Sequence, residues 1–170
     1  MKVLVSDTSV LVDLERGGLL EAVFRLPVEL AVPDLLFERE LRGHGGERLV
    51  ELGLRIEELD AAGVRRAIEY RRARRELSLP DVFALELARR YGWILLTGDG
   101  ALRALAGEHQ VDCHGVLWVL DRIQNDGVVS VQALLDGLRR IEAHPRCRLP
   151  KREIRIRLDR YIAILDLRPQ

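Results

Sequence analysis

The sequence predicts an α/β fold with a central, mainly parallel sheet and helices on both faces. Short β-rich apolar runs alternate with longer helical patterns, the order found in parallel sheets with crossover helices. The runs Lys2–Ser6 and Trp93–Leu96 are nearly continuous apolar segments, as expected for strands covered on both faces. A length of 170 residues and an apolar fraction of 48% suit one globular domain with a small helical extension.

The N-terminal half of the chain is predicted to hold three strands. Lys2–Ser6 is the first, and the following Asp-Thr-Ser breaks it ahead of a helix that begins near Val10 and ends at Gly17 and Gly18. The next elements are a helix over Leu19–Leu26 stopped by Pro27, a strand over Glu29–Val32, a helix over Asp34–Arg42 opened by Pro33, a short helix reaching Leu52, and a half-buried strand over Leu54–Leu59 with period-two alternation.

The C-terminal half is predicted to be mainly helical. Asp60 caps an arginine-rich helix that reaches about Glu76, and Ser78-Leu79-Pro80-Asp81 begins a helix that Gly92 closes. The later elements are the strand Trp93–Leu96, a turn over residues 97–100, a helix over Ala101–Ala106, a short strand over Val111–Cys113, and helices over Val116–Gln124, Ser130–Ala143 and Arg152–Ile164. The predicted division is an α/β domain over residues 1–114 and a helical extension over 115–170 packed on it.

Composition and motifs exclude several classes of protein. No apolar stretch is long enough to cross a bilayer, and Asp7 interrupts the N-terminal apolar run too early for a signal peptide, so the cytoplasm is the expected location. Cys113 and Cys147 have no motif spacing and are expected to be reduced thiols. No zinc spacing, phosphate-binding glycine loop or G-x-S-x-G elbow is present.

Basic residues concentrate in two segments, although the 27 Lys and Arg residues balance the 27 Asp and Glu residues. The first segment, in the helix before Asp81, contains Arg65, Arg66, Arg71, Arg72, Arg74 and Arg75. The second contains Arg146, Arg148, Lys151, Arg152, Arg155, Arg157 and Arg160. Either segment could position phosphates, and either could equally be a solvated helix face paired with nearby carboxylates.

Four acidic residues near the boundaries of predicted elements carry most of the functional information: Asp7, Glu38, Asp81 and Asp99. In an α/β chain, sites form beyond the carboxyl ends of the parallel strands, where these residues are expected to gather. Clustered carboxylates repel one another and are costly to desolvate unless a cation lies between them. A hard divalent ion such as Mg²⁺ or Mn²⁺ fits oxygen ligands, so the set predicts metal-dependent phosphoryl chemistry.

Asp7, Asp81 and Asp99 each have a structural alternative. Asp7 could cap the first helix, but Thr8 or Ser9 could do so instead, which leaves Asp7 without an obvious structural need. Asp81 has capping-box spacing from Ser78 and also heads an apolar helix face. Asp99 lies in Gly-Asp-Gly, which is common turn chemistry. Capping and metal ligation do not exclude each other.

The fourth acid is ambiguous because Glu38 and Glu40 lie two residues apart, on different sides of the predicted helix. Glu38 is preferred because it is one turn from the helix start, near the carboxyl edge of the sheet. The hydroxyls of Thr8, Ser9 and Thr97 could orient the carboxylates or metal-bound waters. Two ions held by shared carboxylates can activate a water and stabilise the leaving oxygen of a phosphodiester.

Three segments resemble the motifs of the PIN-domain family, whose bacterial members include VapC-like toxin ribonucleases. They are Val3-Leu4-Val5-Ser6-Asp7-Thr8-Ser9-Val10-Leu11, Pro80-Asp81-x-x-Ala84-x-x-x-Ala88 and Leu96-Thr97-Gly98-Asp99. The resemblance covers about residues 1–116 and implies a three-layer α/β/α fold with Mg²⁺- or Mn²⁺-dependent endonuclease chemistry on RNA. By motif, Asp7, Asp81 and Asp99 match the acids of the family, with Glu38 as the fourth.

The leading functional hypothesis is an endoribonuclease that cleaves single-stranded RNA, with Arg71, Arg72, Arg74 and Arg75 as candidate RNA-binding residues. The resemblance further implies a toxin role with an antitoxin partner, and a homodimer. The helical stretch after Gly115 resembles the tail of some prokaryotic PIN proteins and departs from the short toxin form.

Two other functions fit parts of the same pattern. A catalytically weak or inactive module that binds RNA or a protein partner would keep the same fold. A phosphatase or phosphoacceptor domain on the same α/β plan is disfavoured, because phosphoacceptor domains need a later lysine and the chain has only Lys2 and Lys151.

Overall fold

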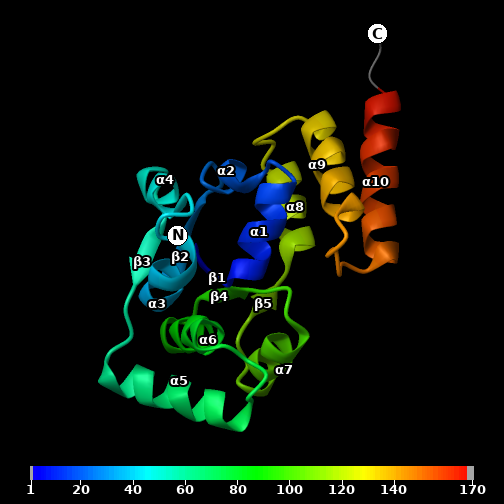
Figure 1. The fold of residues 1–170 in the computed structure, drawn as a ribbon. Coiled ribbons are helices and arrows are strands. Elements are labelled where there is room, and N and C mark those ends of the chain that lie inside the picture. Colours follow the sequence, from blue (N-terminus) through cyan, green and yellow to red (C-terminus); the bar gives the residue numbers. More distant parts are fainter. Residues whose placement is uncertain (1, 168–170) are drawn as a thin grey trace.

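The computed structural model describes residues 2–167, so Met1 and residues 168–170, at the ends of the two predicted parts, lie outside the described residues. Five parallel strands form one sheet in the order β3-β2-β1-β4-β5. Their bounds are β1 Lys2–Ser6, β2 Val28–Pro33, β3 Arg55–Glu57, β4 Ile94–Leu96 and β5 Cys113–His114. Helices cover both faces (Figure 1), which confirms the predicted three-layer α/β/α fold.

The helices follow the sequence pattern closely. They are α1 Thr8–Arg16, α2 Leu20–Val23, α3 Asp34–Leu36, the π-helix η1 Phe37–Leu41, α4 Gly46–Glu51, α5 Ala61–Ala73, α6 Leu79–Tyr91, α7 Gly100–Glu108, α8 Val116–Asn125, α9 Val131–Ala143 and α10 Lys151–Asp166. As predicted, Asp60 caps α5, Ser78 and Asp81 form a capping box on α6, and Gly92 ends α6 in the left-handed conformation.

Three predicted elements differ in the structure. The helix expected over Leu19–Leu26 is the single turn α2, and the chain then continues to Leu26 in i→i+3 turns, with the Arg25 and Leu26 amides each 3.1 Å from the carbonyl three residues before. The helix expected over Asp34–Arg42 changes after one turn into η1, whose i→i+5 pattern places the Arg42 amide 2.8 Å from the Phe37 carbonyl. The arginine-rich helix ends at Ala73, short of the predicted Glu76.

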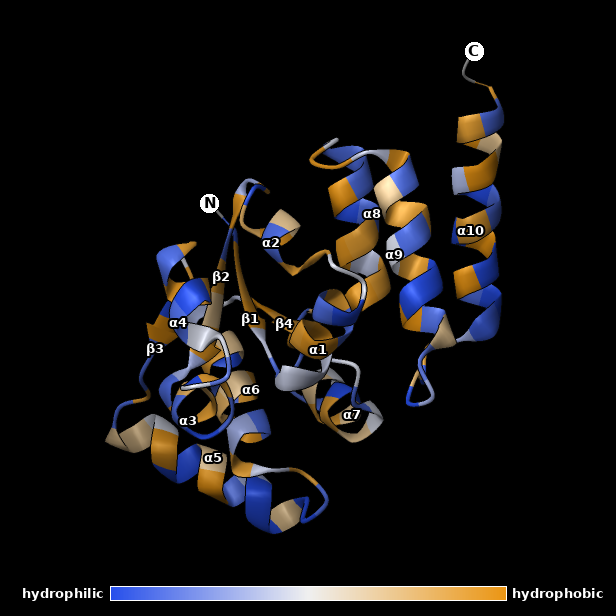
Figure 2. Ribbon diagram, turned by 45° about the horizontal axis from the view of Figure 1, so that its top comes forward, coloured by the Kyte–Doolittle hydropathy of each residue, from blue (hydrophilic) through white to orange (hydrophobic). Residues whose placement is uncertain are grey.

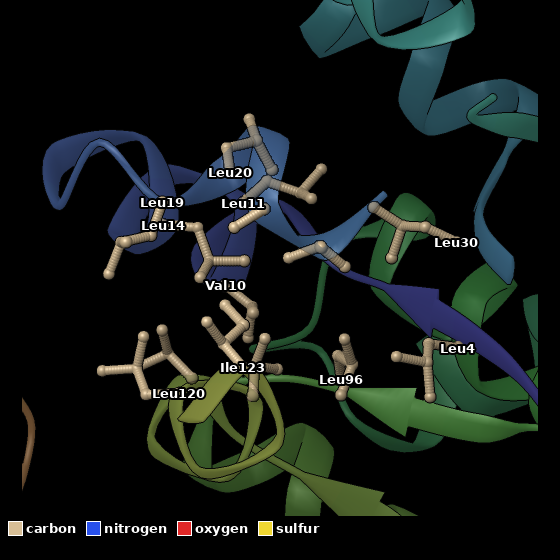
Figure 3. Close-up of a cluster of buried hydrophobic side chains, with 14 of the residues drawn as sticks. Leu4, Val10, Leu11, Leu14, Leu19, Leu20, Leu30, Leu96, Leu120 and Ile123 are labelled. Carbon is tan, nitrogen blue, oxygen red and sulfur yellow. The ribbon is translucent and has the colours of Figure 1, made fainter. Parts of the chain in front are cut away.

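The alternation of side chains along β1 divides the core into two clusters, one on each face of the sheet. Val3 and Val5 pack with residues of α5, α6 and α7. Leu4 points to the opposite face and belongs to the cluster that includes Leu14 of α1, Leu96 of β4 and Leu120 of α8 (Figure 3). Figure 2 shows apolar strands at the centre of the molecule and hydrophilic residues on the outer faces of the helices. The central strand is therefore covered on both sides, as its continuous apolar run predicts.

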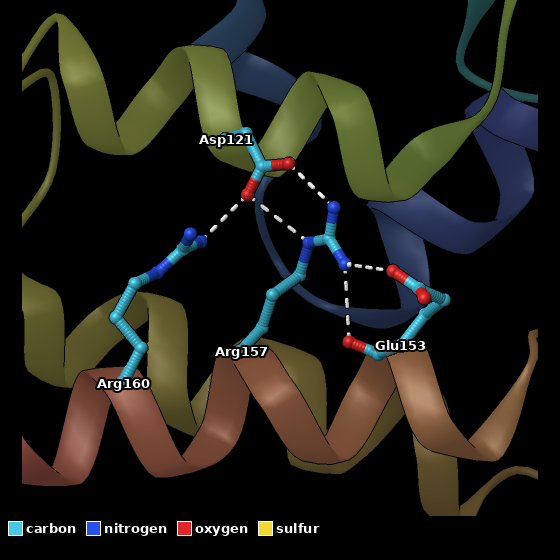
Figure 4. Close-up of polar contacts among 4 residues, drawn as sticks. All are labelled: Asp121, Glu153, Arg157 and Arg160. Atoms are coloured by element: carbon cyan, nitrogen blue, oxygen red, sulfur yellow. Dashed lines mark hydrogen bonds and ion pairs between the residues drawn. The ribbon is translucent and has the colours of Figure 1, made fainter.

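Helices α8, α9 and α10 lie on the α1 side of the sheet and share its core. Asp121 of α8 accepts hydrogen bonds from Arg157 of α10 at 2.5 and 3.0 Å and from Arg160 at 2.6 Å, and Glu153 also binds Arg157 (Figure 4). Because the Arg157 side chain is only 14% exposed, this network attaches α10 to α8 more firmly than a fully exposed ion pair would. The division into residues 1–114 and 115–170 stays a prediction. In the part of the chain that the structure describes, no helix is long and apolar enough to span a membrane.

Two glycines allow α9 to approach α1 closely. A Cβ atom on Gly137 would lie 2.6 Å from Leu19 Cδ1 and 2.9 Å from the carbonyl oxygen of Gly17. The Arg140 guanidinium donates to the same Gly17 carbonyl at 2.7 Å. The contact thus combines close backbone packing with a charged hydrogen bond, and it fixes the position of the helices that follow α8.

Gly137→Ala should lower the free energy of unfolding by about 1–3 kcal/mol, because the added methyl group collides with backbone and the gain in helix propensity is smaller. Gly107→Ala is the matched control, since Gly107 also lies in a helix and a Cβ there meets no atom within 4 Å. The control should be neutral or stabilising by up to about 1 kcal/mol. Chemical denaturation of both variants measures the difference, and equal stabilities would contradict the close contact.

Candidate active site

The carboxyl ends of β1 and β4 bring two distant segments together. The two strands are parallel neighbours with Ser6 opposite Leu96, so the residues after each strand emerge at the same edge of the sheet. The Asp7 amide donates to the Leu96 carbonyl at 2.9 Å and extends the pairing by one more hydrogen bond. Asp7 and the turn Thr97-Gly98-Asp99 therefore lie next to each other.

Asp7 is the most buried carboxylate of the predicted set, with 2% of its surface exposed. One carboxylate oxygen accepts from the Ser9 hydroxyl at 2.7 Å and from the Val10 amide at 3.2 Å, and the other accepts from the Thr97 hydroxyl. Asp7 is thus the N-cap of α1. Capping by Asp7, its structural alternative, is confirmed, and Thr8 or Ser9 does not take this place, because the side chain of Ser9 is directed to Asp7 and Gly98.

Hydroxyl groups link the loop after β1 to the loop after β4. The Thr97 hydroxyl donates to Asp7 and accepts from the Asp99 amide at 2.9 Å. The Ser9 hydroxyl donates to Asp7 and accepts from the Gly98 amide at 2.8 Å. A Cβ atom on Gly98 would lie 3.2 Å from the Ser9 oxygen, so glycine permits this close approach. Each hydroxyl uses both its donor and an acceptor position, which leaves little freedom in the position of Asp7.

Asp99 and Asp81 also begin helices. Asp99 is exposed and caps α7, accepting from the Leu102 amide at 2.8 Å. Asp81 and Ser78 exchange hydrogen bonds of 2.8 and 3.2 Å in the capping box of α6. Three helix N-termini therefore carry the three aspartates, and the partial positive charge at each helix start favours a negative side chain there.

The structure separates the two candidate glutamates. Glu38 is paired with Arg42 on the surface, with 53% of its side chain exposed. Glu40 is partly buried and accepts a hydrogen bond from the Thr8 hydroxyl, on the residue directly after Asp7. Thus Glu40, and not the preferred Glu38, is joined to the segment that carries Asp7. The change to π geometry at Phe37 alters the rotation between these residues, which an α-helical projection of the sequence does not include.

Burial raises the pKa of the Asp7 carboxyl from its ordinary value of 3.8 to about 6. The hydrogen bonds from Thr97, Ser9 and Val10 oppose this rise, and the negative charge of Asp81 adds to it. Within residues 2–167, no cationic side chain forms an ion pair with Asp7. A desolvated carboxylate that is held only by neutral donors is an unfavourable group until a positive charge arrives.

The donor set fits a hard divalent cation in its chemistry. Asp7, Asp81, Asp99 and Glu40 offer oxygen atoms alone, which Mg²⁺ and Mn²⁺ prefer. The electrostatic repulsion that reaches Asp7 from Asp81 is the kind that a bound cation would remove. Among the described residues, however, no three His, Cys, Asp or Glu side chains already lie together in a group that could hold an ion.

Comparison with known protein families shows to which family this chain belongs. A family model described as a PIN domain matches residues 3–161. The chain belongs to the PIN-domain family. The match extends beyond the segments that carry the motif resemblance and includes the C-terminal helices up to Tyr161. Among curated proteins, none matches the chain.

Membership in the PIN-domain family gives the chain a general nuclease character. PIN domains generally are nucleases that act on nucleic acids and use divalent metal ions. In this PIN domain, the three aspartates predicted from the motifs lie at helix starts: Asp7 and Asp99 are the N-caps of α1 and α7, and Asp81 is the acid of the capping box on α6.

The arginines predicted to bind RNA have varied surroundings in this PIN domain. Arg74 forms an ion pair with Glu108 of α7. Arg71 is partly buried, and Arg72 and Arg75 are exposed. Their role in RNA binding stays a prediction.

Asp7→Asn should stabilise the metal-free PIN domain above pH 6. An acid whose pKa is raised on folding favours the native state below its unfolded pKa of 3.8 and loses that contribution as the pH rises to about 6. A shift of this size corresponds to roughly 3 kcal/mol, and asparagine keeps the acceptor that caps α1.

Chemical denaturation in EDTA from pH 4 to 8 measures this effect. The stability gap between Asp7→Asn and the unmodified protein should open between pH 4 and 6 and stay level above that range. Asp159→Asn, on the exposed side of α10, controls for the loss of one negative charge. A gap that is the same at every pH would contradict the burial argument.

Proposed function

We propose that this PIN domain is a metal-dependent endoribonuclease that cleaves the phosphodiester bonds of single-stranded RNA. The observation that carries the proposal is the buried Asp7 carboxylate, which is held by neutral donors at a sheet edge that it shares with Asp99. Such a group destabilises the metal-free fold at neutral pH, and a cation that binds there removes this cost, which favours metal binding.

The residues proposed to hold Mg²⁺ or Mn²⁺ are Asp7, Asp81, Asp99 and Glu40. Bound at this edge, divalent ions supply an activated water and neutralise charge on the leaving oxygen. The protein side chains orient the site: Ser9 and Thr97 fix the two oxygens of Asp7, and Thr8 fixes Glu40. The rigid helix starts of α1, α6 and α7 keep the aspartates in place, so little reorganisation is needed when substrate binds.

Cleavage of a single-stranded RNA in Mg²⁺ or Mn²⁺ tests the proposal directly. Asp7→Asn should lower the cleavage rate at least about a hundredfold, because the amide cannot supply a charged ligand. Asp159→Asn should cleave at the unmodified rate, since this exposed carboxylate is far from the site in the sequence and on α10. Equal cleavage by the Asp7→Asn protein would identify a contaminating nuclease and refute the assignment.

A second candidate function is a catalytically weak or inactive module that binds RNA or a protein partner. One observation favours it: within residues 2–167, no group of three potential ligands is already assembled. Calorimetric titration with Mn²⁺ separates the two candidates. Measurable binding that Asp7→Asn removes supports the nuclease, and no heat from the folded protein supports the module.

Glu40→Gln should lower the cleavage rate at least about tenfold, because it removes the carboxylate that is hydrogen-bonded to Thr8, the residue after Asp7. Glu38→Gln is the matched control, two residues away, and should stay within about twofold because its exposed pair with Arg42 contributes little. Single-turnover cleavage rates of the two variants give the comparison. A loss confined to Glu38→Gln would restore Glu38 as the fourth acid.

The biological setting follows from the family resemblance alone. We extend the proposal to the toxin component of a toxin–antitoxin pair, with a small antitoxin protein as partner and the cytoplasm as location. A homodimer is part of the same extension, and light scattering at high protein concentration examines it. A neighbouring gene for a small DNA-binding protein would support the toxin assignment.

A further inference from the structure

Two adjoining hollows lie beside the acidic edge, and the loop between α9 and α10 forms one wall of both. The first, of about 290 Å³, is lined by Ser9 and Asp99 together with Arg16, Arg146 and Arg148. The second, of about 320 Å³, is lined by Arg103, Arg148 and apolar residues of α8. Both hollows share Asp13, Gly98, Arg148 and Leu149, so they form one continuous surface.

This surface carries more positive than negative charge. Four arginines line it, Arg16, Arg103, Arg146 and Arg148, against the two carboxylates Asp13 and Asp99. Arg16 pairs with Asp13 at 3.1 Å, so these two charges offset each other.

Among the described residues, no carboxylate neutralises the remaining guanidinium groups. Arg103 donates to the backbone carbonyl of Thr97 at 2.8 Å, which leaves its positive charge uncompensated beside the turn that carries Asp99. Arg146 and Arg148 are exposed, and in the part of the chain that the structure describes neither forms an ion pair. Three uncompensated guanidinium groups next to a phosphodiester-cleaving site suit the phosphates of a polyanion.

The loop that carries Arg146 and Arg148 is fixed to the core. The His144 carbonyl accepts from the Cys147 amide at 2.9 Å, and the His144 ring accepts from the Arg146 amide at 3.1 Å. Cys147 and Leu149 pack partly buried against the larger core cluster. At one end the loop follows α9, which Gly137 sets against α1, and at the other it leads into α10, which Asp121 holds. The two arginines are therefore presented at a defined place beside the N-terminus of α1.

We propose that the loop 144–150 binds the sugar–phosphate backbone of single-stranded RNA next to the bond to be cleaved, with Arg146 and Arg148 as the principal phosphate contacts. This inference rests on the proposed nuclease function and adds the path that the substrate takes from the acidic edge. Arg103, which also lines the second hollow, supports the same path. The C-terminal helices thereby contribute to substrate binding as well as to the core.

The alternative path along α5 is less favoured by the surroundings of its arginines. Neither hollow is lined by Arg71, Arg72, Arg74 or Arg75, and Glu108 already pairs with Arg74. The hollows, in contrast, include Asp99 and Ser9 of the acidic edge itself.

The test measures binding separately from cleavage. Fluorescence anisotropy with a labelled single-stranded RNA in EDTA reports affinity without metal-dependent chemistry. The double variant Arg146→Ala/Arg148→Ala should bind at least about tenfold more weakly, independent of RNA sequence. The slope of log affinity against log salt should fall by about 1.4, about 0.7 for each lost phosphate contact.

Two further double variants each remove two positive charges, as the loop variant does. Arg152→Ala/Arg155→Ala removes two exposed arginines of α10 that line neither hollow and should change affinity less than about twofold. Arg71→Ala/Arg72→Ala examines the path along α5. An equal loss in the α10 control, or a loss confined to the α5 variant, would overturn the assignment to the loop.

Circular dichroism of each variant excludes unfolding as the cause of a lost affinity. Measuring RNA cleavage by the unmodified protein in Mn²⁺ distinguishes the proposed substrate path from the proposed nuclease function. If it cleaves RNA and the loop variant binds normally, the substrate path is wrong and the nuclease stands. If it never cleaves, the nuclease proposal fails regardless of the binding result.

Discussion

The burial of one carboxylate organises the edge of the sheet at which β1 and β4 end. Asp7 is placed at the end of the central strand, almost out of contact with water, and its neighbours are a hydroxyl from α1, an amide from α1 and a hydroxyl from the loop after β4. These donors fix both oxygens without neutralising the charge. The pKa of the Asp7 carboxyl is raised because burial penalises its charged form more than these hydrogen bonds stabilise it. A carboxylate in this condition would be stabilised by a nearby positive charge, and the loops after β1 and β4 are arranged around it.

The same bonds that prepare the site also hold the fold together. The Thr97 and Ser9 hydroxyls connect the two loops that follow β1 and β4, while Asp7, Asp81 and Asp99 each begin a helix. Farther away, the close contact of Gly17 with Gly137 and the pairing of Asp121 with Arg157 set the C-terminal helices against α1. Packing at that distance determines where the loop between α9 and α10 meets the acidic edge.

Local signals in the sequence are sufficient to predict the fold and to place the three aspartates at the starts of helices. Continuous apolar runs indicate the buried strands, and the Ser78–Asp81 spacing indicates the start of α6. The position of Glu40 cannot be obtained in this way. A π turn in the middle of a predicted α-helix depends on tertiary contacts, and it changes which glutamate reaches the segment after β1.

The basic hollows are also beyond the reach of sequence patterns. Arg146 and Arg148 stand out only as members of a charged stretch, and Arg16 and Arg103 give no signal. Their assembly on one surface requires the α1–α9 contact, which joins residues more than a hundred positions apart. The density of arginines along the sequence favours α5 equally as an RNA-binding segment. A linear pattern does not show which face of a folded segment lies toward the acidic residues.

Helix capping by the three aspartates has a consequence for how such proteins diverge. Asparagine and serine cap helices about as well as aspartate, so replacing Asp7 or Asp99 would leave α1 or α7 with an N-cap, and Ser78 remains the N-cap of α6 if Asp81 is replaced. At Asp7, a neutral side chain would also remove the free-energy cost of burying a negative charge. A descendant could therefore lose its chemistry in a single mutational step while keeping its architecture, and non-cleaving relatives that retain ligand recognition should arise readily in this lineage.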